Sequence, residues 1–159
     1  ITDQSLIARH VGDLQIGVYV APSYVERLGA PAHPRELQNT DHCIVGFLSS
    51  RTSKIDPLVL CSENERIEIT GNYVLAVDDG NAYLEAGLVG LGVIALPNYM
   101  AAAHQAVGAL IPLFTQWRIS PMPLYLAFPP NRHVNAKLRV FIDWIVELME
   151  QHVPIANNQ

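Results

Sequence analysis

The chain has 159 residues and a net charge of −5, and 50% of its residues are apolar while only 16% are charged. This length fits one ordinary domain, or one and a half lobes, and the apolar content is enough for a packed core. A chain with this acidic balance should not bind nucleic acid by itself, because DNA-binding surfaces are basic. The low charge content indicates surface that is covered in the native protein.

The expected location of the protein follows from its longest apolar run and from the sequence at the start of the chain. Residues 86–96 are too few to span a bilayer and include three glycines, and no signal-peptide pattern is present. We therefore expect a cytoplasmic protein with no membrane association. Because the chain begins at Ile1 rather than Met, we expect it to be a piece of a longer protein. Cys43 and Cys61 are expected to be free buried thiols, with a disulfide between them as the alternative.

The first half of the chain predicts short strands separated by turns and short helices. Gly12 and Asp13 predict a turn, and Pro22 and Gly29 mark the two ends of a helix. Two apolar stretches on either side of a Glu-Asn-Glu sequence predict a hairpin with one solvated face. The expected strands are residues 14–20, 43–48, 58–61 and 66–70, the expected helices are 22–28 and 34–37, and residues 49–54 are expected to form a polar loop.

The middle of the chain is the centre of the predicted fold. Its pattern predicts a strand over residues 73–77, a helix over 81–89 and a buried strand over 91–96, with the two strands as parallel neighbours. Gly90 or Gly92 should end the helix in a left-handed conformation. Open parallel sheets bind small molecules at the carboxyl ends of their strands. We therefore expect this βαβ unit to form one wall of a ligand cleft.

The last third of the chain ends in a long amphipathic helix. Its apolar residues recur at three- and four-residue spacings, and Arg139 and Asp143 are spaced to form an ion pair along it. Val140, Trp144 and Val146 extend the apolar surface beyond one stripe, so we expect two sides of this helix to be covered. The elements expected here are a helix over residues 97–107, strands over 109–114 and 124–128, and the terminal helix over 134–149 with Asn135 as its N-cap.

The chemistry-bearing patterns do not predict a catalytic centre. A G-x-G-x-x-A sequence starts at Gly90, but it follows a helix and precedes a strand, the reverse of a dinucleotide site. We interpret its glycines as a helix stop and a point of close packing. The six histidines lack the spacing of a zinc site, and the chain has no G-x-S-x-G sequence and no phosphate-binding loop with a lysine. We expect no enzymatic activity, no metal and no cofactor.

Two adjacent acids, Asp78 and Asp79, follow the first strand of the βαβ unit. We interpret them as helix-capping residues. In the functional alternative, the free backbone N–H groups of Gly80, Asn81 and Ala82 meet a carboxylate or a polar group of a ligand. The loop residues that can face the same cleft, or else form an ordinary solvated loop, are Ser49, Ser50 and Arg51.

Short matches to one known family run in order along almost the whole chain. They are residues 5–9 (SLIAR), 21–24 (APSY), 29–37 (GAPAHPREL), 87–93 (GLVGLGV), 96–99 (LPNY), 108–110 (GAL), 124–126 (LYL), 129–133 (PPNRH) and 139–144 (RVFIDW). In this order and spacing they resemble the effector-binding domain of LysR-type transcriptional regulators, and within that family the CrgA-like subgroup.

The resemblance implies an α/β fold of the periplasmic-binding-protein-like type II, with two lobes joined by two crossover strands. On that pattern, residues 1–19 end the first pass through lobe I, residues 20–123 form lobe II, and residues 124–159 return to lobe I. Lobe II is then complete and lobe I partial. The family's N-terminal helix-turn-helix is absent from this sequence, so DNA binding would belong to the missing part.

The resemblance also implies a small polar or carboxylate effector between the lobes, and a homo-oligomer, either dimer or tetramer, in the full-length regulator. The effector-binding residues that we expect are Ala21, Ser49, Ser50, Arg51, Asp79, Gly80, Asn81, Pro97, Asn98 and Tyr125. Two alternatives stay open. A solute-binding protein of the same fold would need a secretory signal upstream, and a small α/β enzyme would need a convergent acid, base or nucleophile in the cleft.

Overall fold

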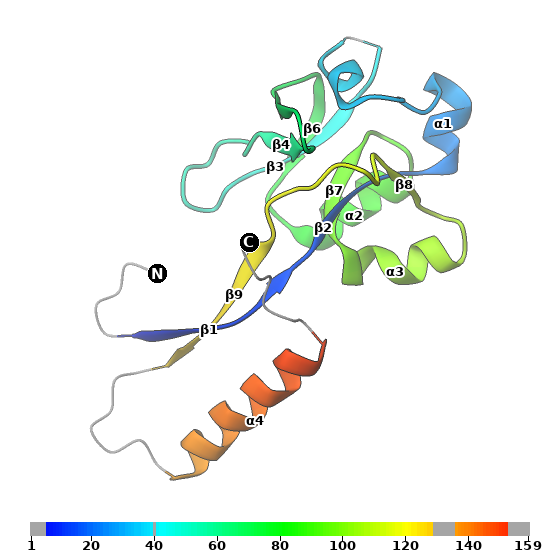
Figure 1. The fold of residues 1–159 in the computed structure, drawn as a ribbon. Helices are drawn as coiled ribbons and strands as arrows, with labels where there is room; N and C mark the ends of the chain where they lie inside the picture. The colour runs from blue at the N-terminus through cyan, green and yellow to red at the C-terminus, as the bar shows by residue number, and fades with distance from the viewer. Residues whose placement is uncertain (1–5, 40, 129–135, 153–159) are drawn as a thin grey trace. The chain divides into compact units, whose positions relative to one another are not determined.

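The computed structural model describes residues 6–39, 41–128 and 136–152, and its contacts divide the chain into two compact units (Figure 1). Unit 1 combines residues 1–14 with residues 121–159, and unit 2 consists of residues 15–120. Unit 2 is therefore one continuous stretch of chain, whereas unit 1 is assembled from both ends.

Unit 2 contains a mixed sheet and a separate hairpin. In the sheet, β2 lies between β7 and β8 and pairs antiparallel with both, while β3 pairs parallel with β6. In chain order its elements are β2 (Ile16–Val20), α1 (Pro22–Leu28), the 3₁₀ helix η1 (Pro34–Gln38), β3 (Ile44–Phe47), β4 (Leu58–Cys61), β5 (Arg66–Ile69), β6 (Tyr73–Val77), α2 (Gly80–Leu88), β7 (Ile94–Pro97), α3 (Asn98–Ala106) and β8 (Ile111–Leu113).

One short backbone connection joins the two groups of strands. Val93, just before β7, forms a parallel bridge with Ile44 of β3. Its N–H donates to the carbonyl of Cys43 at 2.8 Å, and its carbonyl accepts from the N–H of Val45 at 3.0 Å. The strands of unit 2 therefore follow the spatial order β6, β3, β7, β2, β8.

The prediction that residues 73–77 and 91–96 form neighbouring strands is wrong. They run in the same direction, but β3 lies between them, so the connection through α2 passes over one strand. A strand in the middle of a sheet is covered on both faces. β3 fits this place, because Ile44, Val45 and Gly46 are all buried. The second strand is also shorter than predicted and begins at Ile94.

Glycines mark the ends of the helices as predicted. Gly29, Gly90 and Gly108 follow α1, α2 and α3 with φ values of 77°, 77° and 74°, in the left-handed region that other residues resist. Gly92 serves close packing instead, because a Cβ there would lie 2.9 Å from the carbonyl oxygen of Cys43. The structural interpretation of the G-x-G-x-x-A sequence is thus confirmed.

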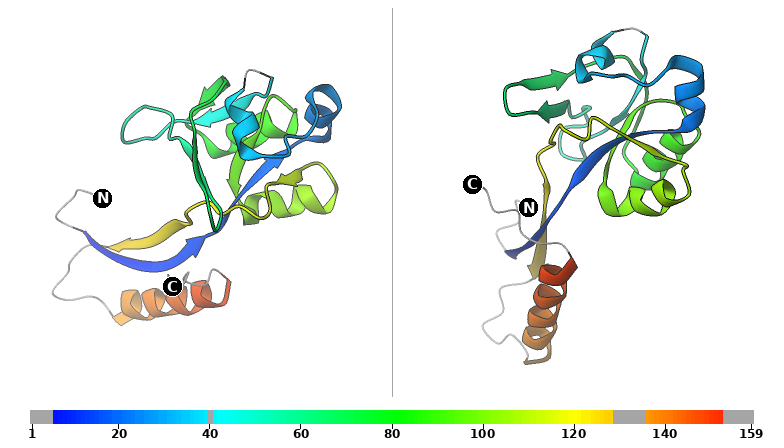
Figure 2. Two further views of the ribbon diagram at one scale, coloured as in Figure 1. Left: turned by 45° about the horizontal axis from the view of Figure 1, so that its top comes forward. Right: turned by 45° about the vertical axis from the view of Figure 1, so that its right-hand side comes forward.

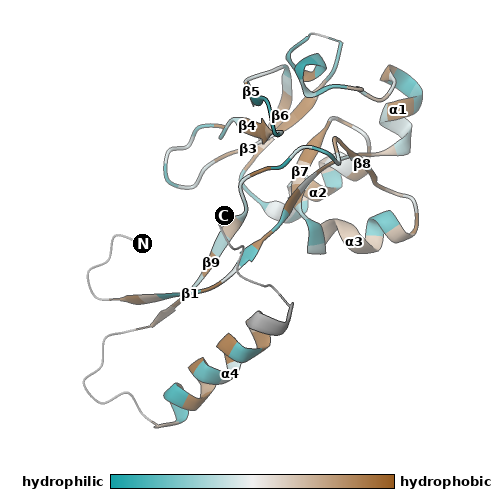
Figure 3. Cartoon of the chain, viewed as in Figure 1, coloured by the Kyte–Doolittle hydropathy of each residue, from teal (hydrophilic) through white to brown (hydrophobic). Residues whose placement is uncertain are grey.

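The core of unit 2 consists of two clusters of buried apolar side chains, and the brown strands of Figure 3 mark where they gather. The first cluster joins the β4–β5 hairpin, which pairs as predicted, to β2 and β3. The second lies under α2 and α3. Cys43 and Cys61 are free, as predicted, but both are only half-buried.

Unit 1 is a two-stranded antiparallel ribbon with one helix on it (Figure 2). Strand β1 (Ile7–Leu14) pairs with β9 (Met122–Phe128), and α4 (Ala136–His152) lies against β1. The predicted turn at Gly12 and Asp13 is wrong, since both residues continue β1 beyond a register shift. Because polar and apolar residues do not alternate regularly in this segment, its sequence does not show a strand pattern. The capping role of Asn135 lies outside the described residues.

Helix α4 has two apolar faces. Ile142 is buried against the ribbon, whereas Val140, Phe141 and Trp144 are 68%, 50% and 53% exposed. Asp143 forms an ion pair with Arg9 of β1 at 3.6 Å, rather than the predicted pair with Arg139. The exposed face is therefore apolar, which favours association.

We expect the isolated 159-residue chain to self-associate through this exposed face. Exchanging Phe141 for lysine and Trp144 for glutamate should shift the sedimentation profile toward monomer, because both side chains are half exposed and contribute to the patch. Val107→Lys, at the exposed end of α3, is the matched control and should change nothing. A monomeric wild-type profile at high concentration would contradict the expectation.

Tyr83 gives unit 2 a defined sensitivity to alkali. Burial, together with the nearby Tyr73, raises the pKa of Tyr83 to about 12, although the N–H of Ala95, which donates to its hydroxyl at 3.1 Å, acts in the opposite direction. The neutral phenol is stable in the fold below its unfolded pKa of about 10. As pH rises from about 10 to 12, the unfolded chain loses this proton first, so stability falls.

We expect urea unfolding to show a decline on the order of 2 to 3 kcal/mol over that interval. Tyr83→Phe should lower stability at neutral pH by about 1 to 2 kcal/mol, because the half-buried N–H of Ala95 loses its acceptor. The same variant should also flatten the alkaline decline. An equally steep decline in Tyr83→Phe would assign the effect to other tyrosines.

Candidate functional site

The carboxyl ends of three strands that run in the same direction lie along one edge of the sheet in unit 2. The N–H of Leu48, after β3, donates to the carbonyl of Val77 at the end of β6 at 2.7 Å. The Val93 bridge places β7 on the other side of β3. The segments that follow these strands are residues 49–51, 79–81 and 97–98. Most of the residues that sequence analysis predicted for the effector site thus share one edge.

The start of α2 differs from the prediction in one respect. The side chain of Asp79 accepts hydrogen bonds from the N–H groups of Asn81 and Ala82, at 3.0 and 2.8 Å. These two donors are therefore not free for a ligand, which corrects the functional alternative stated for them. Asp79 acts as the N-cap, and the side chain of Asn81 remains exposed beside it.

Gly80 has space around it and an ordinary backbone. It does not have a positive φ, and a Cβ built on it would meet only the Cε of Met100, at 3.9 Å. Gly80 therefore does not need a left-handed conformation. Any requirement for glycine here must come from the approach of something outside the chain.

Asn98, at the start of α3, is held by a residue of β2. The hydroxyl of Tyr19 donates to the Oδ1 of Asn98 at 2.9 Å, and the N–H of Asn98 donates to the carbonyl of Gln15 at 2.8 Å. Burial raises the pKa of Tyr19, so its hydroxyl stays protonated as a donor. A Cβ on Gly17 would collide with the Tyr19 ring and with Asn98.

Sequence reasoning missed Gln15, Gly17 and Tyr19 at this edge. They come together with Pro97 and Asn98 because β2 runs antiparallel to β7, with Ile16 opposite Pro97. No local pattern signals such a contact across the sheet. The signal that could have found it is the register of a β2–β7 pair.

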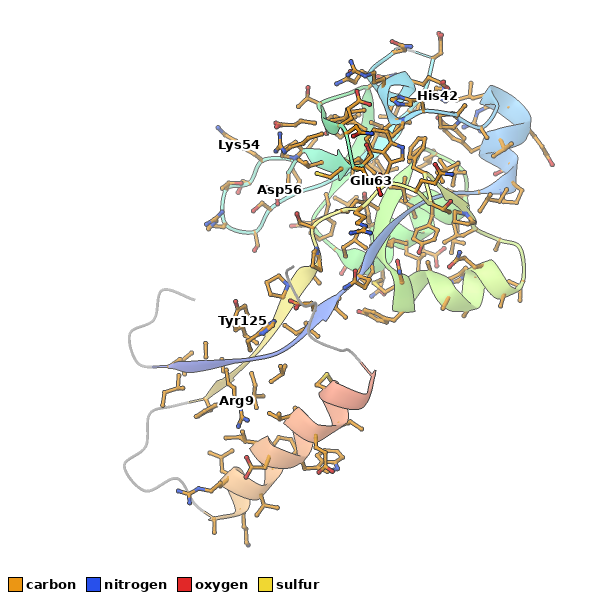
Figure 4. All side chains as sticks on the ribbon, viewed as in Figure 1. Arg9, His42, Lys54, Asp56, Glu63 and Tyr125 are labelled. Atoms are coloured by element: carbon orange, nitrogen blue, oxygen red, sulfur yellow. The ribbon has the colours of Figure 1, made fainter. Side chains whose placement is uncertain are left out.

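The loop after β3 contributes a guanidinium, that of Arg51, to this edge. The N–H of Ser49 donates to the carbonyl of Lys54 at 2.9 Å, and Ser53, with a φ of 53°, closes the turn back onto Ser49. Lys54 and Asp56 lie further along this loop (Figure 4). In the described part of the chain, the exposed guanidinium of Arg51 has no ion pair. Ser50 is exposed beside it.

Two predicted residues are not brought to this edge within unit 2. Ala21 is 1% exposed and lies at the other end of β2, where it is the N-cap of α1. Tyr125 belongs to β9 of unit 1, where its ring lies 5.4 Å from the ring of His10 and is 55% exposed. The position of Ala21 follows from the antiparallel direction of β2, which puts the end of β2 opposite the start of β7.

Two further features of the described residues concern metal ions and membranes. Within residues 6–39, 41–128 and 136–152, no three His, Cys, Asp or Glu side chains gather in a way that could hold a metal ion. In the same residues, none of the helices is long and apolar enough to cross a membrane.

The α/β fold matches that of LysR regulatory domains, which have a periplasmic-binding-protein-like type II fold. The family model of the LysR substrate binding domain matches residues 1–150, and the chain belongs to this family. These are the effector-binding regulatory domains of LysR-type transcriptional regulators from bacteria, and they are not enzymes.

Relatives and solved structures agree with this assignment. The chain is 27% identical over 155 residues to an HTH-type transcriptional repressor of Pseudomonas aeruginosa, covering 98% of this chain and 48% of that protein. The regulatory domain of CrgA from Neisseria meningitidis is similar with a TM-score of 0.73 and 27% identity, over 94% of this chain and 71% of that one. The chain spans about half the length of the curated relatives it matches.

The capping role of Asp79 can be tested by removing its carboxylate. We expect Asp79→Ala to lower the free energy of unfolding by about 1 kcal/mol, because the N–H groups of Asn81 and Ala82 lose their acceptor. Thermal and urea unfolding measure the change. Asp78→Ala is the matched control, since the neighbouring carboxylate is not the cap. Equal losses in the two variants would contradict the capping role.

Proposed function

We propose that the carboxyl edge of β3, β6 and β7 is one wall of the effector site, and that the effector is a small polar molecule or a monocarboxylate. The observation that carries the proposal is that the polar side chains of Ser50, Arg51 and Asn81 are exposed together at this edge. Arg51 supplies a guanidinium, the residue type that binds carboxylates in a bidentate manner. Ser49, Ser50 and Asn81 add hydroxyl and amide groups to the same edge.

The charges at this edge favour a single negative charge on the ligand. Asp78 and Asp79 are both exposed at the start of α2, and two carboxylates repel a strongly anionic ligand. Asp79 is partly compensated by the two N–H groups that it accepts from, and the guanidinium of Arg51 can form one bidentate pair with a single carboxylate. The space around Gly80 supports the approach of such a group to the helix start.

We further propose that effector binding at this domain controls DNA binding by a helix-turn-helix elsewhere in the regulator, which acts as a homo-oligomer. The names of the relatives, HTH-type transcriptional regulators, support the DNA-binding part. The acidic balance of this chain supports placing DNA contacts outside it. A cytoplasmic location agrees with this function.

The test uses the full-length regulator and a panel of monocarboxylates and dicarboxylates in a thermal-shift screen. For a compound that stabilises the wild type, Gly80→Val and Arg51→Gln should each need at least a tenfold higher concentration to give the same thermal shift. The valine side chain blocks the approach of the ligand to the helix start, and the glutamine removes the cation that pairs with its carboxylate. Operator binding in a gel shift should be unchanged. A bulky replacement of Pro97 should also abolish the effector response.

Ala106→Val, at the far end of α3, is the control for added bulk. The melting temperature of each variant without ligand must stay near that of the wild type, which the open space at Gly80 predicts. If a stable Gly80→Val protein responds to the compound at the wild-type concentration, the helix start is only a structural cap and the effector binds elsewhere.

A further inference from the structure

A polar hollow opens in unit 2, and it shares no lining residue with the proposed effector site. Its walls are the turn of the β4–β5 hairpin, the loop after β8 and the segment before η1. They contribute residues 61–64, residues 116–118 and His33. Its volume of about 840 Å³ falls in the range of sites that hold small ligands.

Backbone hydrogen bonds fix two of these walls against each other. Cys61 and Arg118 exchange both of their backbone hydrogen bonds, at 2.8 and 2.7 Å, so the loop after β8 pairs with the hairpin. The N–H of Trp117 donates to the carbonyl of Phe114, a residue held at a φ of 53°. A bulky residue adopts this conformation only where its surroundings impose it. The hollow is therefore a preformed feature of the backbone.

The aromatic part of the hollow is also held in place. The ring of His33 meets the ring of Trp117 edge to face, with centroids 5.2 Å apart. The Nδ1 of His33 accepts from the N–H of Arg35 at 3.2 Å, and its Nε2 lies 3.6 Å from the carboxylate of Glu65. Trp117 is half-buried and packs against the first core cluster. Its exposed part offers a planar apolar surface to the hollow.

The polar part differs because four of its side chains have no partner among the described residues. Glu65 is bound by Arg35 and faces His33, but in the described residues the neighbouring Glu63 forms no ion pair or hydrogen bond. The same holds for the guanidinium of Arg118, for the amide of Asn64 and for that of Gln116. Glu63 projects from the hairpin turn (Figure 4). The hollow thus presents one unpaired cation, one unpaired anion and two amides beside an indole.

We propose that this hollow is a second ligand site, specific for a zwitterionic α-amino acid with a planar side chain. The carboxylate of such a ligand pairs with Arg118, its ammonium group pairs with Glu63, and its side chain packs on Trp117. A purely anionic ligand is opposed by Glu63, and a purely cationic one by Arg118. Only a ligand with both charges satisfies the whole set.

The test is isothermal titration calorimetry on the full-length regulator with three related probes: L-phenylalanine, phenylacetate, which lacks the ammonium, and phenethylamine, which lacks the carboxylate. We expect saturable binding of L-phenylalanine and binding of the other two that is about tenfold weaker. Arg118→Gln and Glu63→Gln should each weaken L-phenylalanine by about tenfold. Glu63→Gln should also narrow the difference between L-phenylalanine and phenylacetate.

Matched controls lie on the same hairpin. Arg66→Gln and Glu68→Gln remove an exposed ion pair of β5 that does not line the hollow, and they should change the affinity less than about twofold. Gly80→Val should leave L-phenylalanine binding intact, which separates this site from the proposed effector site. The proposal is overturned if L-phenylalanine fails to saturate the folded wild type at millimolar concentration. It is also overturned if phenylacetate binds more tightly, or if the variants of lining residues match the controls.

Discussion

Two hydrogen bonds at Val93 hold the sheet of unit 2 together. Without them, β3 and β6 would form a separate parallel pair, and β7, β2 and β8 an antiparallel group. With them, the ends of β6, β3 and β7 point the same way at one edge. Gly92 permits this contact, because its lack of a side chain lets the chain approach the backbone of residues 43–45. The candidate site therefore depends on a close approach that only glycine allows.

Most of the polar groups at that edge already form hydrogen bonds within the chain. Asp79 caps α2, Asn98 accepts from Tyr19, and Ser49 closes its own loop through its backbone. Groups that are hydrogen-bonded within the chain are not available to a ligand, but these internal bonds also hold the remaining groups in place. Arg51 has no ion pair among the described residues. In the site that we propose at this edge, selectivity comes from a small number of available contacts rather than from many.

Local sequence patterns predicted most of the elements, because the signals for them are local. Pro22 and Gly29 bound α1 where expected, and alternating apolar residues produced the β4–β5 hairpin. The insertion of β3 between β6 and β7 could not be predicted in this way, since it depends on competition between strands for the centre of the sheet. The contact between Tyr19 and Asn98 spans 79 positions in the chain. The place of Ala21 at the other end of β2 likewise depends on strand direction, which is a property of the sheet.

The two units also differ in how their contacts are distributed along the chain. Unit 2 is continuous and most of its pairings join segments within it, so a nascent chain can complete it once residue 120 has left the ribosome. The β1–β9 ribbon must wait until the whole of unit 2 has been made, because its two strands flank that unit. Closing so long a loop is entropically costly and slow. During synthesis, β1 therefore lacks its β9 partner for as long as unit 2 is being made, and chaperones have that interval in which to bind it.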